Sequence, residues 1–145
     1  MYRGELAKLE GVWTGTERID DEDAHYEATG RMEFHTVFDG RFLLCDYIQT
    51  AADRPTAVGH GVFHKDERSG ALTVSWFRSP GATSNQQADG IAEGDRLIFV
   101  ETVGEVSTRT TYSVALNRLT VITERSKSGS EWKSVFEGSY RRPRG

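Results

Sequence analysis

The sequence predicts an all-β protein that closes into an up-and-down antiparallel barrel of about ten strands, with a short N-terminal helix at the closed end. Strand-like segments follow one another from residue 11 to residue 141, with essentially no helical pattern after residue 10. The connections between them are short, so neighbours in sequence are expected to pair in space. Such a meander would expose two long edges unless it closed, and closure removes them. A β-sandwich is the competing architecture.

The chain opens with a helix-like segment at residues 3–9, in which Leu6 and Leu9 have the i, i+3 spacing of one helix face. A helix this short is marginal in isolation and must pack against another part of the protein. Gly11 is expected to end it. The first strand follows at residues 11–19, which contain Val, Trp, Thr and Ile.

Alternation of apolar and polar residues is clearest in residues 26–38, where Met32 and Phe34 share one face and charged residues occupy the other. A period of two places successive side chains on opposite faces of a sheet. The dipeptide Asp39-Gly40 comes directly after this segment. It predicts a two-residue hairpin, because glycine adopts positive φ without steric cost.

The remaining strands are predicted in the same way, and the intervening segments, including residues 79–84, are turns and loops. These strands cover residues 41–50, 56–64, 71–78, 85–91, 96–103, 107–115, 119–125 and 131–141. The inward face of strands 41–50, 56–64 and 96–103 stays open, because each carries apolar residues on both sides. Such two-sided strands suggest a second buried surface, for which a homodimer contact is one candidate.

Composition indicates a single domain, residues 1–145, of ordinary soluble character, with 37% hydrophobic residues. The net charge is −4 with both signs scattered, which argues against a nucleic-acid partner, since phosphate binding needs a clustered basic surface. No apolar run is long enough for a membrane helix, and residues 1–10 lack the apolar core of a signal peptide. With a single cysteine, Cys45, the chain is predicted to be cytoplasmic.

The two ends of the strand series are predicted to meet at the floor of the barrel. Trp13 would cover the closed end with its ring, and Gly11 would let the chain approach closely. An arginine at the end of the last strand could lie on the indole face and donate to nearby carbonyl groups. Counting alternate residues from Trp132 to Tyr140 favours Arg142 over Arg141. Gly11, Trp13 and Arg142 are thus assigned a structural role.

The Gly11-x-Trp13 motif after a short helix resembles the calycins, the group of lipocalins, fatty-acid-binding proteins and nitrobindin-like barrels. Together with Phe38-Asp39-Gly40-Arg41-Phe42-Leu43, Leu72 to Phe77 and Trp132 to Arg142, it resembles a bacterial lipocalin-like family of unknown function. These short motifs span nearly the whole chain. The resemblance implies a barrel that binds a small molecule, but a shared fold does not fix an activity.

The four histidines are candidate metal or haem ligands and candidate general bases. Nitrobindin-like barrels bind haem through a histidine near the end of the chain, whereas the last histidine here is His64. This departure argues against haem ligation of that type and leaves open only His60 or His64 in another geometry. No cofactor is expected. His60 and His64 lie about 13 Å apart along a strand, too far to share a metal ion, so no metal site is predicted.

Aromatic residues recur at alternating positions on different strands. A barrel of about ten strands is usually wider than its side chains can fill, so inward aromatic residues often line a cavity. The predicted cavity residues are Phe34, Trp76, Phe99, Tyr112, Trp132, Phe136 and His60.

Three functions are compatible with this pattern. The first is a non-catalytic barrel that binds an apolar or amphipathic small molecule. The second is an enzyme that uses the same cavity, with His35, His60 or His64 as a general base. No catalytic set is recognisable, since Cys45 lies mid-strand and no Gly-x-Ser-x-Gly elbow is present. The third is a dimeric interaction module whose core is filled. A hollow interior would separate the first from the third.

Overall fold

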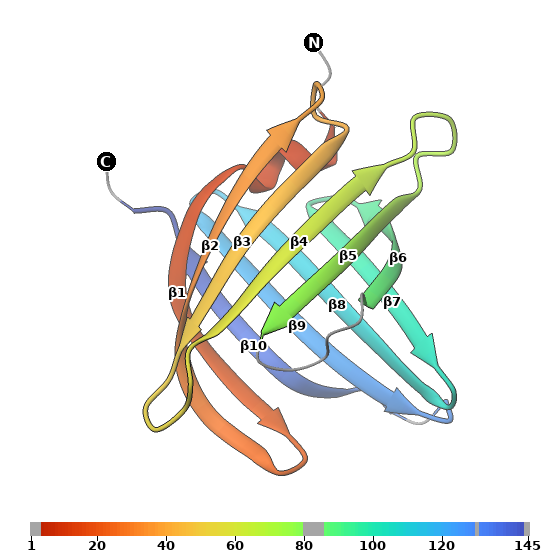
Figure 1. Cartoon of the computed structure of the whole chain (residues 1–145). Coiled ribbons are helices and arrows are strands. Elements are labelled where there is room, and N and C mark those ends of the chain that lie inside the picture. The colour runs from red at the N-terminus through yellow and green to blue at the C-terminus, as the bar shows by residue number, and fades with distance from the viewer. Residues whose placement is uncertain (1–3, 80–85, 130, 144–145) are drawn as a thin grey trace.

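Ten antiparallel strands close into a barrel in the computed structural model, which describes residues 4–79, 86–129 and 131–143 (Figure 1). The strands are β1 (Gly11–Asp21), β2 (Ala24–Val37), β3 (Phe42–Thr50), β4 (Ala57–Lys65), β5 (Leu72–Ser79), β6 (Gln86–Glu93), β7 (Arg96–Val103), β8 (Val106–Ala115), β9 (Arg118–Lys127) and β10 (Lys133–Arg141). Each pairs with the next in sequence, and β1 also pairs with β10. The predicted closed barrel is therefore confirmed. Most of the loop expected at residues 79–84 falls outside the described residues.

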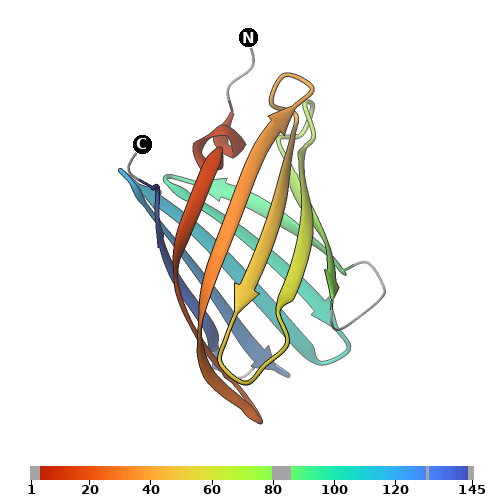
Figure 2. The ribbon, with the colours of Figure 1, turned by 60° about the vertical axis from the view of Figure 1, so that its left-hand side comes forward.

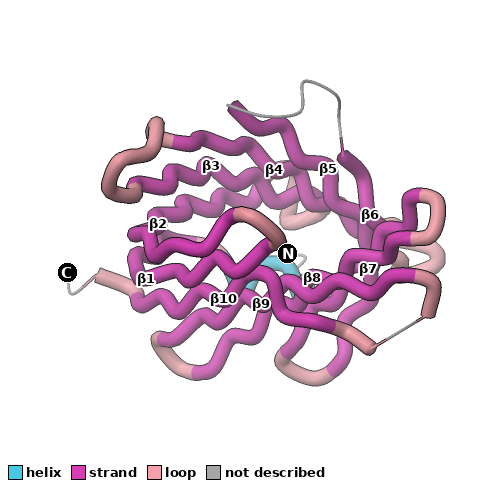
Figure 3. Tube along the Cα trace, turned by 90° about the horizontal axis from the view of Figure 1, so that it is seen from below, coloured by secondary structure: helices cyan, strands magenta, loops and turns pink. Residues whose placement is uncertain are grey.

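The N-terminal segment forms a 3-10 turn, η1 (Glu5–Leu9), at one end of the barrel. The last strand, β10, ends near the same end of the barrel, beside the start of β1 (Figures 1 and 2). Viewed from the opposite end, the strands form a ring around η1 (Figure 3). Leu6 and Leu9 are completely buried in the main core, so the apolar face of η1 caps the barrel. Within the described residues, no helix is long and apolar enough to cross a membrane.

The floor is built as the sequence indicated. The Arg142 guanidinium lies 4.0 Å from the centre of the Trp13 ring and donates to the carbonyl oxygens of Glu10 (2.6 Å) and Lys8 (3.2 Å). Trp13 Nε1 donates to the Leu9 carbonyl at 2.8 Å. Gly11 has φ +120°, and an added Cβ would lie 2.4 Å from Arg142 Nη1. These contacts tie η1 to the first and last strands.

The structure decides which face of the ambiguous strands points inward. Leu43 and Cys45 on β3, Phe63 on β4, and Leu97 and Phe99 on β7 belong to the buried core. Their neighbours Asp46, His60 and Val100 point outward and are exposed or half-exposed. Closure makes this choice, because only one face of each strand can pack against η1 and the opposite wall.

A β-bulge in β10 changes the expected alternation of the last strand. The register with β9 shifts between Ser134 and Phe136, so Val135 has no partner. Phe136 and Tyr140 lie on the inner face, whereas Ser134 pairs with Glu124 on the outer face. A bulge adds one residue and reverses the side-chain parity on either side of it. The single alternation predicted from Trp132 to Tyr140 is therefore wrong before the bulge.

The turn between β2 and β3 is longer than the predicted two-residue hairpin. The strand ends at Val37, and Phe38, Asp39 and Gly40 all have positive φ. Gly40 N donates to the Val37 carbonyl and Arg41 N to the Phe38 carbonyl, each at 3.2 Å. Phe38 is consequently 72% exposed, although the sequence placed it in the strand. The signal located the turn correctly but did not fix its length.

Candidate functional site

A cavity of about 410 Å³ occupies the half of the barrel away from η1. All ten strands contribute side chains to its walls, although β6 contributes only Ala88. The apolar lining includes Ile19, Met32, Val74, Trp76, Ala88, Phe99, Tyr112, Val121 and Phe136. A hollow interior of this size falls within the range of small-molecule sites. It argues against a core filled by side chains.

Four of the predicted cavity residues, Trp76, Phe99, Tyr112 and Phe136, line this cavity. The Phe99 and Tyr112 rings meet edge-to-face, with centroids 5.9 Å apart. Gly61 faces Trp76, and a Cβ at Gly61 would lie 2.9 Å from the indole Cη2. The glycine on β4 therefore leaves the space that the indole occupies.

The other three predicted cavity residues lie elsewhere. Phe34 is buried against Phe63, centroids 6.0 Å apart, and is not part of the lining. Trp132 precedes β10 and stacks under the Arg109 guanidinium, 4.2 Å away, on the outer face. His60 is on the outer face and bonds Asp46 Oδ1 through Nδ1 at 3.0 Å. The predictions for Trp132 and His60 are wrong. The bulge in β10 turns Trp132 to the outer face, and the sequence of β4 did not show which of its faces points inward.

A second wall of the cavity is polar and contains a residue that the sequence predictions missed. Glu17 is only 2% exposed and lies behind the lining residues Tyr47, Gln49 and Tyr140. Tyr47 Oη donates to both carboxylate oxygens at 2.8 and 2.9 Å. Tyr140 Oη donates to Oε2 at 2.5 Å and Gln49 Nε2 to Oε1 at 2.9 Å. These bonds replace the water that a buried carboxylate loses.

Two glycines make room for this cluster. A Cβ at Gly30 would lie 2.1 Å from Glu17 Oε2, and one at Gly138 would lie 2.2 Å from Tyr140 Oη. The sequence carries a signal for Glu17: Trp13 and Glu17 have the same parity, so an inward Trp13 implies an inward acid on the first strand. The alternate glycine Gly15 between them would have strengthened that inference.

The mouth of the cavity is charged. Asp21, Arg78, Glu101 and Arg125 line it near the ends of their strands. Arg125 Nη1 bonds Asp21 Oδ1 at 2.5 Å, and both side chains are about one-third exposed. The Arg78 guanidinium lies 5.3 Å from the Trp76 ring centre. The cavity thus runs from a charged, solvated entrance to an aromatic interior with one polar wall.

Burial keeps the phenols of the cavity protonated. Desolvation is the main cause that raises the pKa of Tyr47, Tyr112 and Tyr140, and for Tyr47 and Tyr140 the nearby Glu17 carboxylate raises it further. Burial likewise raises the pKa of the Cys45 thiol. A completely buried thiol with a raised pKa is a poor nucleophile. The structure therefore gives Cys45 a packing role.

These pKa shifts predict a loss of stability at alkaline pH. In the unfolded chain the phenols ionise near pH 10, whereas Tyr47, Tyr112 and Tyr140 keep their protons when folded. The unfolded state then binds fewer protons, so the free energy of unfolding should fall as pH rises above about 10, by up to about 4 kcal/mol per pH unit. Urea unfolding from neutral pH upward measures the fall. Complete ionisation of all five tyrosines in a still-folded protein would contradict it.

None of the histidines lines the cavity among the residues that the structure describes. His25 and His60 bond aspartates on the outer face, His35 lies 3.3 Å from Glu33, and His64 stacks on Phe42 with centroids 4.5 Å apart. The hypothesis that His35, His60 or His64 acts as a general base inside the cavity is therefore wrong, since none of the three lines it.

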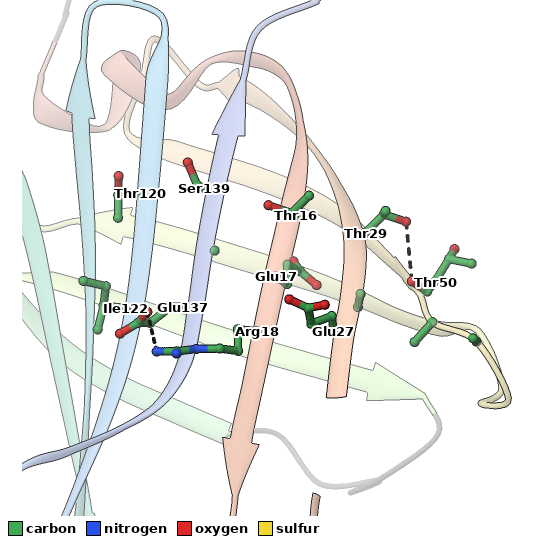
Figure 4. A pocket seen from close by; sticks show the side chains of 14 residues that line it. Thr16, Glu17, Arg18, Glu27, Thr29, Thr50, Thr120, Ile122, Glu137 and Ser139 are labelled. Carbon is green, nitrogen blue, oxygen red and sulfur yellow. Dashed lines mark hydrogen bonds and ion pairs between the residues drawn. The ribbon is translucent and has the colours of Figure 1, made fainter. Parts of the chain in front are cut away.

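A larger hollow lies on the outside of the barrel. It measures about 800 Å³ and runs over β1, β2, β9 and β10 to the end of β3 (Figure 4). Most of its side chains point away from the barrel core and are exposed, such as Thr16, Thr29 and Ser139, and Arg18 pairs with Glu137 at 2.8 Å. It is a shallow groove over a solvated sheet face. The enclosed, apolar interior cavity is the better candidate for a ligand site.

Comparison with known proteins gives a family and a fold. Residues 3–142 match the model of a family described as "Protein of unknown function (DUF1579)". The crystal structure of Rv2717c from M. tuberculosis is similar with a TM-score of 0.70 and 18% sequence identity, over 96% of this chain and 95% of that one. At that identity the likeness concerns the fold alone. No curated protein matches the chain.

Proposed function

This chain belongs to the DUF1579 family, and we propose that it is a non-catalytic, calycin-like barrel that binds an apolar or amphipathic small molecule in its interior. The single observation that carries the proposal is the cavity of about 410 Å³ lined by Trp76, Phe99, Tyr112 and Phe136. Apolar pockets with a few polar groups are typical of small-molecule sites.

The arrangement of polar groups supports binding over catalysis. Glu17, the buried acid behind the polar wall, accepts hydrogen bonds from Tyr47, Gln49 and Tyr140 and does not line the cavity. A general base must reach a proton of the substrate directly or through one water. The carboxylate is instead separated from a ligand by the side chains that bind it.

Filling the mouth of the cavity is expected to abolish binding. Ala57 lines the cavity and the adjacent Val58 is 45% exposed on the outer face of β4. Ala57→Trp places an indole in the entrance, whereas Val58→Trp places the same group in solvent. Naphthalene, titrated by calorimetry, is expected to bind wild type and V58W and to bind A57W at least about tenfold more weakly. Native mass spectrometry of the purified protein should show a retained ligand in wild type.

The matched pair makes the result interpretable. Equal binding of naphthalene to A57W and wild type would contradict an interior site. Failure of naphthalene to bind wild type, together with an empty native mass spectrum, would overturn the proposed function.

A further inference from the structure

The side chains of the polar wall donate their hydroxyl and amide protons to one another. Tyr47 and Tyr140 each carry one hydroxyl proton, and both are donated to Glu17. The Gln49 amide has two protons, of which one goes to Glu17 Oε1 at 2.9 Å and the other to Tyr47 Oη at 3.0 Å. The Gln49 carbonyl oxygen accepts from Tyr26 Oη at 3.2 Å. Every proton of this wall is therefore already committed within it.

A ligand at this wall therefore meets only oxygen lone pairs, which can accept hydrogen bonds but cannot donate them. A phenol that donates its proton still has acceptor capacity on its oxygen, and Tyr47 and Tyr140 both line the cavity. The carboxylate of Glu17 behind them adds negative potential, which is felt strongly because the site is buried. A carboxylate group placed here would meet acceptors only, and it would lose its hydration without compensation.

We infer that the cavity selects an amphipathic molecule whose buried end donates a hydrogen bond, such as an alcohol or a phenol, and discriminates against the corresponding carboxylate. This inference rests on the proposed function and specifies the ligand class for the same site. The apolar body of such a molecule lies against Trp76, Phe99 and Phe136, and its hydroxyl group donates to Tyr47 or Tyr140.

The charged mouth does not reverse this preference. Arg78 is exposed at the entrance, where solvent and salt screen its charge, and it lowers the pKa of Tyr47 less than the Glu17 carboxylate raises it. Arg125 is bonded to Asp21, and Glu101 lines the same entrance. The polar wall, by contrast, lies in the enclosed part of the site, where an unmatched polar group costs most.

Three compounds with one ring system test the inference: naphthalene, naphthol and naphthoate. In wild type, naphthol is expected to bind about tenfold more tightly than naphthalene, and naphthoate more weakly than naphthalene. Naphthoate binding as tightly as naphthalene, or more tightly, would overturn the inference and leave the proposed function intact. Failure of naphthalene itself to bind, together with an empty native mass spectrum, would overturn both.

Variants then test whether Glu17 sets the preference. The amide of Glu17→Gln donates to a phenol oxygen, so a phenol proton turns toward the cavity. The naphthol-to-naphthoate affinity ratio should fall about tenfold, with naphthalene affinity unchanged. Glu27→Gln, an exposed glutamate on β2, is the matched control and should keep the wild-type ratio. A wild-type ratio in E17Q would overturn the inference.

A second variant keeps the test decisive if E17Q does not fold. Tyr140→Phe removes one acceptor from the wall and leaves the aromatic ring in place. It should lower the preference for naphthol over naphthalene severalfold. An unchanged preference in both Y140F and the corresponding Tyr47→Phe variant would overturn the inference.

Discussion

Trp13→Ala is expected to lower the free energy of unfolding by about 4–5 kcal/mol. The side chain is completely buried at the floor, donates to the Leu9 carbonyl at 2.8 Å and lies under the Arg142 guanidinium. Its removal leaves a cavity and an unpaired Leu9 carbonyl, and it removes a contact that ties η1 to the barrel. For a domain of this size the melting temperature should fall by roughly 10–20 °C, which a thermal denaturation curve measures.

Trp132→Ala is the matched control for that experiment. Trp132 is half-buried outside the barrel, where its main partner is Arg109 at 4.2 Å. An exposed cation–π contact contributes about 1 kcal/mol, so W132A should cost no more than a small part of the W13A effect. Equal losses in the two variants would contradict the assignment of Trp13 to the floor and of Trp132 to the outer face.

Glu17→Ala is expected to cost about 3 kcal/mol of stability. The substitution leaves the donors of Tyr47, Gln49 and Tyr140 without their acceptor in a buried site. Water that enters from the adjacent cavity offsets a part of that cost. Urea unfolding of the variant against wild type gives the difference directly.

Two further variants isolate the network. Glu27→Ala removes an exposed carboxylate from the neighbouring strand and should change stability by less than about 0.5 kcal/mol. The double variant Glu17→Ala with Tyr140→Phe should cost less than the sum of the two single variants, because the phenylalanine removes a donor that E17A leaves unpaired. Strict additivity would show that Glu17 and Tyr140 do not act as a unit.

Much of the fold could be predicted because alternation reports directly on which face of a strand is buried. The alternate apolar residues of β2 and β5 placed Met32, Phe34, Val74 and Trp76 on the inner face, where the structure has them. Short turns implied sequential pairing, and the lack of a natural edge implied closure. The floor followed from the chemistry of an indole, a glycine and an arginine at the two ends of the strand series.

The site could be predicted only in part. Alternation correctly predicts four aromatic lining residues. It fails for Trp132, because the extra residue Val135 in the bulge moves Trp132 to the opposite face of the strand. Glu17 was missed because a charged residue in a strand is ordinarily taken for an outward one. Its burial depends on Tyr47, Gln49 and Tyr140, which come from two other strands and are far from it in sequence.

The β architecture, the closed end of the barrel and the aromatic character of its interior thus follow from the sequence alone. These properties are local, since each depends on the period of a strand or on residue types at a chain end. The tertiary structure alone decided where parity breaks, which strands face inward and that Glu17 lies behind a wall of phenols. Those outcomes depend on pairing register and on hydrogen bonds between β1, β3 and β10, and no single segment of the chain contains that information.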